Sequence, residues 1–487
     1  MDVGAYRLST LHERAYALCL PVKPATIRDS MFRAELFADD ILAHKDFRKS
    51  DRVLIVGMGA VGIVVAAKLL HRGINVVVCD VRPSAPSWMN SETRSICPTT
   101  FDFPVEHWSN GKFPPDASFS PDFTWTAGIG QDVWDSLEKQ FNALVAKSGV
   151  RGFGRITGTL VDLADAGDKI KVSIESLSKG REDSELFDGV ILCTGPGREK
   201  LALRNSQFSS RSFWWVDDCE PDGTSDASML IVGAGDGGLA DFSRVLTGYN
   251  YPNAILQELC QWVPIDQVNK CNTQMWKAFQ GDKANDHEWL SKTQLFMNEI
   301  VDSVWREPGL RDRVQNHLLR PLSRRPAVQL ACNCCHFGMS YVANRIVAQI
   351  LARALAQDLG ANNRELVPFL CLQTCSEIVG VGHECSGNAF ECSGEGHRVS
   401  FVGASCDGAR DLSHDPCLTG RVRANLTPKD DLSRGTVDLS VKPREYGHIL
   451  LRLGADQQIP ENVKTAILDA MQGESEFRDV LHFQYKP

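Results

Sequence analysis

The sequence predicts an α/β fold built on parallel sheets, and three observations support this prediction. Residues 53–56 form a short apolar run without helical period, which is typical of a buried parallel strand. Three glycines, Gly57, Gly59 and Gly62, follow at once, and an apolar pattern of helical spacing comes after them. The same order of features returns at residues 229–238. The chain therefore contains two regions that each begin with a strand, a glycine turn and a helix.

The first of these regions has all the parts of a unit that binds a dinucleotide. In the pattern Gly-x-Gly-x-x-Gly, Gly57 allows a tight turn, Gly59 lets backbone approach a pyrophosphate, and Gly62 lets the helix pack on the strand. The start of the helix then presents unpaired N–H groups to the phosphates. A second strand ends in Asp80, whose carboxylate can accept hydrogen bonds from a ribose.

Composition narrows the class of protein. With 487 residues, 43% of them hydrophobic, the chain is long enough for two or three domains with substantial cores. A formal net charge of −9 argues against nucleic acid or an anionic membrane as a partner. The first residues carry charges throughout, without the apolar core of a signal peptide, and no apolar run approaches the roughly 18 residues of a membrane helix. We therefore expect a soluble, cytoplasmic protein.

Periodicity and the two glycine motifs divide the chain into three segments. Residues 1–49 are predicted to form a helical N-terminal extension. Residues 50–225 would form the first dinucleotide-binding domain. Residues 226–487 would form a second, partly degenerate domain of this kind, with a helical insertion at about residues 250–360 and a C-terminal segment.

The order of strands also repeats between the two regions. The corresponding positions are Gly57 with Gly233, residues 171–174 with residues 398–401, and residues 187–195 with residues 446–454. Chance alignment of apolar strands is the alternative explanation. If the repeat is real, the two halves share one topology.

This succession of motifs resembles the flavoproteins that contain two dinucleotide-binding domains. That superfamily includes pyridine nucleotide-disulfide oxidoreductases, thioredoxin reductases and flavin monooxygenases. The resemblance implies a Rossmann-like FAD-binding domain and a second, partly degenerate NAD(P)-binding-like domain. It implies that FAD is held by Gly57, Gly59, Ala60, Gly62, Asp80, Arg82, Thr194 and Gly195, and that a nicotinamide dinucleotide faces Gly233, Gly235 and Gly238.

The sequence departs from this superfamily at three points. The superfamily usually has Glu where this chain has Asp80. After the second glycine motif, residues 254–258 could form the expected strand, with Glu258 on the ribose, but they fit a helix equally well. The C-terminal Gly-Asp segment that closes the flavin site has its best candidates at residues 403–407 and 454–456. The second site therefore either binds NAD(P)H, with Glu258 favouring NADH, or is vestigial.

Two residues are candidates for a catalytic role. Cys97 lies where the disulfide-reductase branch carries a redox cysteine, but it has no partner at the usual spacing. Cys97 could instead react alone through a sulfenate. The other alternative is that it is an ordinary thiol, buried or in a loop. His107 shares a loop with Phe101, Phe103 and Trp108, which offer aromatic surface to a flavin or substrate. Packing of these aromatic rings in the core is the competing explanation.

The cysteines raise the question of a metal site. The relevant residues are Cys332, Cys334, Cys335, His336, Cys371, Cys375, His383 and Cys385. Structural zinc prefers two pairs of the Cys-x2–4-Cys type, and adjacent cysteines do not easily reach one ion together. Cys79 and Cys193 lie in apolar strand patterns, where cysteine packs as a small hydrophobe. We therefore predict free thiols and no metal.

The sequence as a whole predicts an FAD-dependent oxidoreductase that acts on a small molecule. NAD(P)H would reduce the flavin, and the electrons would pass to oxygen or an organic substrate. Two alternatives stay open. One is an NAD-dependent dehydrogenase that uses the first site alone, and the other is a non-catalytic nucleotide-binding sensor whose second half contacts other proteins.

Overall fold

The chain folds into two compact units. Unit 1 comprises Met1–Glu92, Ile96–Arg198 and Ala455–Pro487, and unit 2 comprises Thr93–Ser95 and Glu199–Gly454. The computed structural model describes residues 6–18, 27–82, 94–96, 123–125, 128–148, 152–177, 180–195, 198–202, 210, 213, 228–233, 235–249, 252–259, 261–264, 267, 271, 287–321, 324–331, 342–358, 369–370, 373–380, 397–403, 444–446, 448–451, 455–456 and 459–473.

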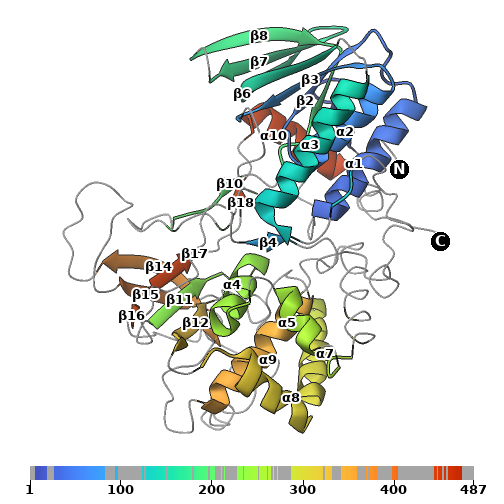
Figure 1. The fold of residues 1–487 in the computed structure, drawn as a ribbon. Helices are drawn as coiled ribbons and strands as arrows, with labels where there is room; N and C mark the ends of the chain where they lie inside the picture. The colour runs from blue at the N-terminus through green and yellow to red at the C-terminus, as the bar shows by residue number, and fades with distance from the viewer. Residues whose placement is uncertain are drawn as a thin grey trace. The chain divides into compact units, whose positions relative to one another are not determined.

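Unit 1 is organised around a seven-stranded sheet among the described residues, with the strand order β1-β9-β2-β3-β6-β7-β8 (Figure 1). The strands are β1 (Ala15–Ala17), β2 (Arg52–Val56), β3 (Asn75–Asp80), β6 (Phe153–Asp165), β7 (Ile170–Ser176), β8 (Arg181–Phe187) and β9 (Gly189–Leu192). From β1 to β6 the neighbours are parallel, and β7 and β8 continue the sheet in antiparallel pairing. The carboxyl ends of the parallel strands therefore share one edge.

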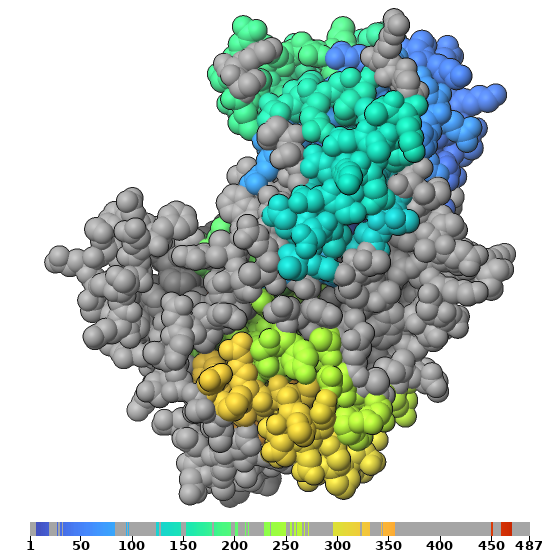
Figure 2. Space-filling view, viewed as in Figure 1, coloured from blue at the N-terminus to red at the C-terminus, as the bar shows by residue number. Residues whose placement is uncertain are grey.

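Three helices connect the parallel strands of unit 1. They are α1 (Ile27–Ala43), α2 (Ala60–His71) and α3 (Gly130–Ser148), and α2 contacts both of the others. Each helix joins a strand to another further along the sheet in the same direction. Right-handed crossovers of this kind place their helices on one face. In Figure 2 the surface of α3 (teal) lies beside that of the N-terminal segment (blue).

The helix α10 (Glu461–Gly473) packs on β6, where Asn462 Nδ2 donates to Asp162 Oδ1 at 2.7 Å.

The core of unit 1 explains why β2 and α2 form where they do. Val53, Leu54 and Ile55 are fully buried, because β2 lies in the middle of the sheet. The helix α2 is apolar on nearly all sides, since it packs against the sheet and against two other helices. Lys68 and His71, both in its last turn, are the only polar side chains of α2.

Unit 2 has a parallel sheet with the order β13-β12-β11-β17 and a separate antiparallel sheet β14-β15-β16. Its strands are β11 (Ser228–Val232), β12 (Ala327–Ala331), β13 (Phe369–Leu370), β14 (Gln373–Gly380), β15 (His397–Gly403), β16 (Arg444–Tyr446) and β17 (His448–Leu451). Its helices are α4 (Asp236–Thr247), α5 (Pro252–Leu259), α7 (His287–Trp305), α8 (Pro308–Arg313), the π-helix η6 (Val314–Leu318) and α9 (Val342–Asp358). Four further short strands form two two-stranded sheets. In one, β4 (Ser95–Ile96) pairs with β5 (Gly128–Ile129), and in the other, β10 (Arg198–Glu199) pairs with β18 (Ala455–Asp456).

The predicted repeat between the two halves is confirmed by the strand pairing. In each half the strand before the glycine turn lies between the next parallel strand and a late strand, so that β9-β2-β3 corresponds to β17-β11-β12. In each half an antiparallel three-stranded segment precedes the late strand, β6-β7-β8 in one and β14-β15-β16 in the other. The α/β fold class with two Rossmann-like halves is therefore the fold of this chain.

Two elements differ from the sequence-based expectation. Residues 254–258, one option for the second strand of the second half, belong to the helix α5. The strand beside β11 is instead β12, because the helices from α5 to η6 are inserted between α4 and this strand. The N-terminal extension contains the predicted helix, which is α1, but it also contains the strand β1. This strand has three residues, which is too short for a periodic pattern to show in the sequence.

Candidate functional site

The first glycine turn joins β2 to α2 in a conformation that requires glycine at its first position. Gly57 has φ +100°, and a Cβ atom there would lie 2.5 Å from the carbonyl oxygen of Cys193. Its N–H donates to the carbonyl oxygen of Cys79 at 2.7 Å, and the N–H of Cys193 donates to Val56 O at 2.7 Å. The turn is thus tied to the ends of β3 and β9, on either side of β2.

The other two glycines of this turn have different roles. A Cβ atom on Gly62 would lie 1.9 Å from the carbonyl oxygen of Gly57, so Gly62 is needed for the helix to pack on the turn. A Cβ atom on Gly59 would meet no atom of the described residues within 4 Å. Gly59 is the N-cap of α2, which begins at Ala60 and has neither a capping side chain nor an acidic residue in its first turn. Open space therefore adjoins a helix start whose N–H groups are available to an anion.

Asp80, at the end of β3, links that strand to the glycine turn. Its Oδ2 accepts a hydrogen bond from the Met58 N–H at 2.7 Å, and its Oδ1 accepts one from the Arg82 N–H at 3.1 Å. Asp80 is half-buried. Burial raises the pKa of Asp80 above its ordinary value, although the hydrogen bonds from Met58 and Arg82 oppose this shift. Asp80 lies beside the turn, where the adenosine ribose of a dinucleotide would approach.

Thr194 and Gly195 follow β9, the other neighbour of β2. Gly195 has φ +67°, which lets the chain turn away at the end of the strand. The Thr194 Oγ1 atom is buried and has no hydrogen-bond partner among the described residues. A buried polar atom without a partner calls for an explanation, and a hydroxyl or phosphate oxygen of a ligand would supply one. The residues at this edge thus fit a dinucleotide.

The second glycine turn reproduces the geometry of the first. Gly233 has φ +108°, and its N–H donates to the carbonyl oxygen of Ala331 at 2.8 Å, at the end of β12. A Cβ atom on Gly238 would lie 1.8 Å from Gly233 O. One on Gly235, the N-cap of α4, would meet nothing within 4 Å in the part of the chain that the structure describes. Three glycines in the second half therefore occupy the same three structural positions.

The two turns differ in charge. The first turn of α4 contains Asp236, whose Oδ1 accepts a hydrogen bond from Asn344 Nδ2 at 2.8 Å. A carboxylate at this place already interacts with the positive end of the helix dipole. The strand register aligns Val56 with Cys79 in one half and Val232 with Ala331 in the other, so β12 is the counterpart of β3. The second turn thus has a carboxylate where phosphate would bind, and the first turn has none there.

The suggested role of Glu258 as a ribose ligand is wrong. Glu258 lies on α5, and its carboxylate forms an ion pair with Arg313 of α8. Residues 254–258 therefore do not form the strand that this role required. The preference for NADH that rested on Glu258 has no support from this residue.

The catalytic and metal candidates lie mostly outside the described residues. This applies to Cys97, Phe101, Phe103, His107, Trp108, Cys332, Cys334, Cys335, His336, Cys371, His383 and Cys385, while Cys375 is described only as backbone of β14. Within the described ranges, no three His, Cys, Asp or Glu side chains gather as a metal site would need. The same ranges contain no helix that is both long and apolar enough to span a bilayer. Cys79 and Cys193 are buried free thiols, as predicted.

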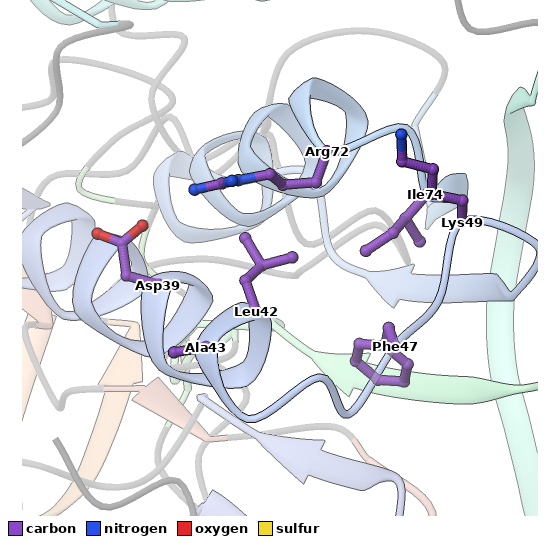
Figure 3. Close-up of a pocket in the computed structure, with 7 residues that line it drawn as sticks. All are labelled: Asp39, Leu42, Ala43, Phe47, Lys49, Arg72 and Ile74. Carbon is purple, nitrogen blue, oxygen red and sulfur yellow. The ribbon is translucent and has the colours of Figure 1, made fainter.

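A hollow of about 450 Å³ lies elsewhere on unit 1 (Figure 3). Asp39, Leu42 and Ala43 line it from the last turns of α1, and Arg72 lines it from the end of α2. Helix C-termini carry a negative partial charge, which disfavours a phosphate. This hollow is at the opposite end of α2 from Gly59, so it is separate from the first glycine turn.

A buried ion pair in unit 2 has no signal in the sequence. Arg94 donates to Asp241 of α4, and the two side chains are 2% and 0% exposed. The Arg94 guanidinium also stacks 3.8 Å from the ring centre of Phe213. Arg94 stands more than 140 positions before Asp241, so no local pattern could have linked the two. The pair holds the segment around Arg94 against the helix that follows the second glycine turn.

Comparison with known proteins gives distant matches to solved structures. No protein-family model matches the chain, and no curated protein matches it. A lysine monooxygenase, NbtG of Nocardia farcinica, aligns with 16% identity over 32% of this chain, with a TM-score of 0.20, and this chain covers 34% of its length. Thioredoxin reductase of Lactococcus lactis aligns with 13% identity over 89% of this chain and 99% of its own, with a TM-score of 0.34.

A third solved structure, the cadaverine monooxygenase DfoA of Erwinia amylovora bound to FAD, aligns with 11% identity. The alignment covers 85% of this chain and 80% of that one, with a TM-score of 0.36. The function proposed for this chain therefore depends on the geometry of its own two glycine turns.

Proposed function

We propose that the chain is an FAD-dependent oxidoreductase in which the first glycine turn holds FAD and the second receives NAD(P)H. The observation that supports this most is the first turn itself. Among the described residues, Gly59 leaves open space before α2 and the buried Thr194 hydroxyl has no hydrogen-bond partner. The first turn of α2 contains no acidic residue. A pyrophosphate would lie on the N–H groups at the start of α2, and Asp80 would accept hydrogen bonds from the ribose.

The charge difference between the two turns supports this assignment of cofactors. A resident cofactor needs tight binding, whereas a nicotinamide dinucleotide must arrive and leave in each cycle. The neutral start of α2 favours a pyrophosphate, and Asp236 at the start of α4 weakens the attraction for one. The first turn is therefore the better site for the resident group.

When bound, the flavin would supply the redox chemistry, accepting electrons from a nicotinamide and passing them to oxygen or a small organic substrate. The residues described here would bind and orient the two dinucleotides. Gly57 and Gly62 shape the first turn, Gly233 and Gly238 shape the second, and neither set includes a group that exchanges protons.

The test is anaerobic mixing of the flavin-loaded protein with NADH and with NADPH. Reduction by either nucleotide, seen as loss of the flavin absorbance, supports the proposal. A protein that carries flavin but is reduced by neither nucleotide would favour an oxidase that takes electrons directly from its substrate. A protein that binds NAD and takes up no FAD would favour the dehydrogenase, in which the first turn binds NAD alone.

A further inference from the structure

The start of α4 differs from the start of α2 by one carboxylate. Gly59 and Gly235 are the N-caps of the two helices, so Asp236 occupies in α4 the place that Ala60 occupies in α2. The free N–H groups of a first helical turn attract a carboxylate as well as a phosphate. The direction in which the Asp236 side chain is held therefore decides whether the start of α4 can receive a pyrophosphate.

A hydrogen bond from a neighbouring helix holds this side chain. Asp236 Oδ1 accepts from Asn344 Nδ2 at 2.8 Å, and Asn344 is the third residue of α9, which packs against α4. The helix α9 follows β12, and in the sheet β12 and β17 lie on opposite sides of β11. Asn344 therefore draws the carboxylate toward the side of α4 that is away from β17.

The opposite side of α4 is where a dinucleotide would lie. From β11 the strand order runs through β12 to β13 in one direction, and β17 lies in the other. In open parallel sheets, ligands bind outside the carboxyl ends of the strands, at the point where the order reverses. That point is between β11 and β17, so the contact with Asn344 keeps Asp236 on the side of α4 away from it.

The buried amide of Asn344 is oriented by Asp236. The side chain is 1% exposed, and its Oδ1 atom has no hydrogen-bond partner in the described part of the chain. Rotation of the amide by half a turn would set Oδ1 against the Asp236 carboxylate, so that two acceptors would face each other. The bond to Asp236 thus outweighs the cost of leaving a buried acceptor unpaired.

We propose that Asn344 is a positioning residue of the second nucleotide site. It holds the Asp236 carboxylate against α9 and so leaves the N–H groups at the start of α4 to the pyrophosphate of a nicotinamide dinucleotide. This inference rests on the proposed function of the second turn. It explains how a turn that contains a carboxylate can receive an anion and still release it in each cycle.

The test is a double-mutant cycle on the FAD-loaded full chain. Anaerobic stopped-flow reduction, with the nucleotide that reduces the wild-type flavin, gives an apparent Kd and a limiting rate. Asn344→Leu should raise the apparent Kd roughly threefold to tenfold, because the released carboxylate turns onto the start of α4. Asp236→Ala should lower it about twofold to fivefold. The double variant should match Asp236→Ala, since Asn344 acts only through Asp236.

The matched control is Gln349→Leu, which removes a second buried amide from α9, five positions further along the helix. It should leave the apparent Kd unchanged. The effect of Asn344→Leu should appear in the apparent Kd and not in the limiting rate, whereas general loosening of α9 would act in Gln349→Leu as well.

Three results overturn the inference while the proposed function stands. They are an unchanged apparent Kd in Asn344→Leu, an equal loss from Asn344→Leu with and without Asp236→Ala, and weaker binding in Asp236→Ala. A wild-type protein that holds FAD but is reduced by neither nucleotide overturns both. If Asn344→Leu does not fold, Asn344→Ala makes the same comparison, with and without Asp236→Ala.

Discussion

The carbonyl oxygen of Gly57 lies 1.9 Å from the position that a Cβ atom on Gly62 would take. The first and last glycines of the motif are therefore packed backbone to backbone, which brings the start of α2 directly onto the end of β2. The corresponding approach in the second half is 1.8 Å, between Gly233 and Gly238. The two motifs thus share a packing requirement that exists before any ligand binds.

This packing predicts that Gly62→Ala destabilises the protein whether or not a cofactor is present. The methyl group would overlap the carbonyl group of Gly57, and neither backbone segment can move without separating β2 from α2. We expect a loss of roughly 2–3 kcal/mol or more in the free energy of unfolding. Denaturant unfolding of the flavin-free variant measures it, and unchanged stability would show that the turn relaxes easily.

Gly59→Val should leave the stability of the protein nearly unchanged and abolish FAD binding. A side chain at this position enters open space, and the backbone angles of Gly59 (φ −70°, ψ −173°) suit any residue. The flavin-free protein should therefore lose less than about 1 kcal/mol. FAD binding should be abolished, because the side chain fills the space that the pyrophosphate needs. Retention of FAD with wild-type affinity would place the cofactor elsewhere.

Asp80→Asn should weaken cofactor binding and change the pH dependence of stability. Loss of a charged hydrogen bond to the ribose should cost about 1.5–3 kcal/mol of binding free energy. Because burial raises the pKa of Asp80, the fold favours the protonated carboxyl group over the carboxylate. The contribution of Asp80 to stability is present below its ordinary pKa and is lost as the pH rises through its raised value.

The flavin-free Asp80→Asn variant should accordingly gain stability relative to wild type as the pH rises from about 3 to 7. Denaturant melts of both proteins across this range provide the measurement. A stability difference that stays constant with pH would show that the pKa of Asp80 is not raised by the fold.

The sequence predicted the parts of the fold that local pattern determines. The strand at residues 53–56, the glycine turn and Asp80 stand within 30 positions, so their spacing alone defines a Rossmann-like unit. The repeat was visible because each glycine turn recurs with its strands in the same order. Neither β1 nor the pair of Arg94 and Asp241 could be predicted, because a three-residue strand has no periodicity and a distant ion pair has no spacing rule.

The second half was harder to predict for a related reason. The insertion from α5 to η6 separates α4 from β12, so the strand that belongs beside β11 lies about 80 residues later than in the first half. Residues 254–258 had the apolar content of a strand, but they follow Pro252 in a short helix. Tertiary context, and not local propensity, decides the pairing there.

Gly235→Val should separate the two sites. Gly235 leaves open space at the start of α4, as Gly59 does at the start of α2, so the variant should fold and keep its FAD. Reduction of the flavin by NADH or NADPH should be lost, because the side chain fills the place of the nicotinamide dinucleotide's pyrophosphate. Stopped-flow reduction of wild type and variant measures this, and equal rates would mean that the second turn binds no nucleotide.

The visible absorbance spectrum of the purified full-length protein, with identification of any nucleotide released on denaturation, tests the central claim most directly. The account predicts flavin absorbance bands and FAD as the released compound, or stoichiometric uptake of added FAD by protein purified without it. A colourless protein that takes up no FAD, and binds NAD instead, would contradict it.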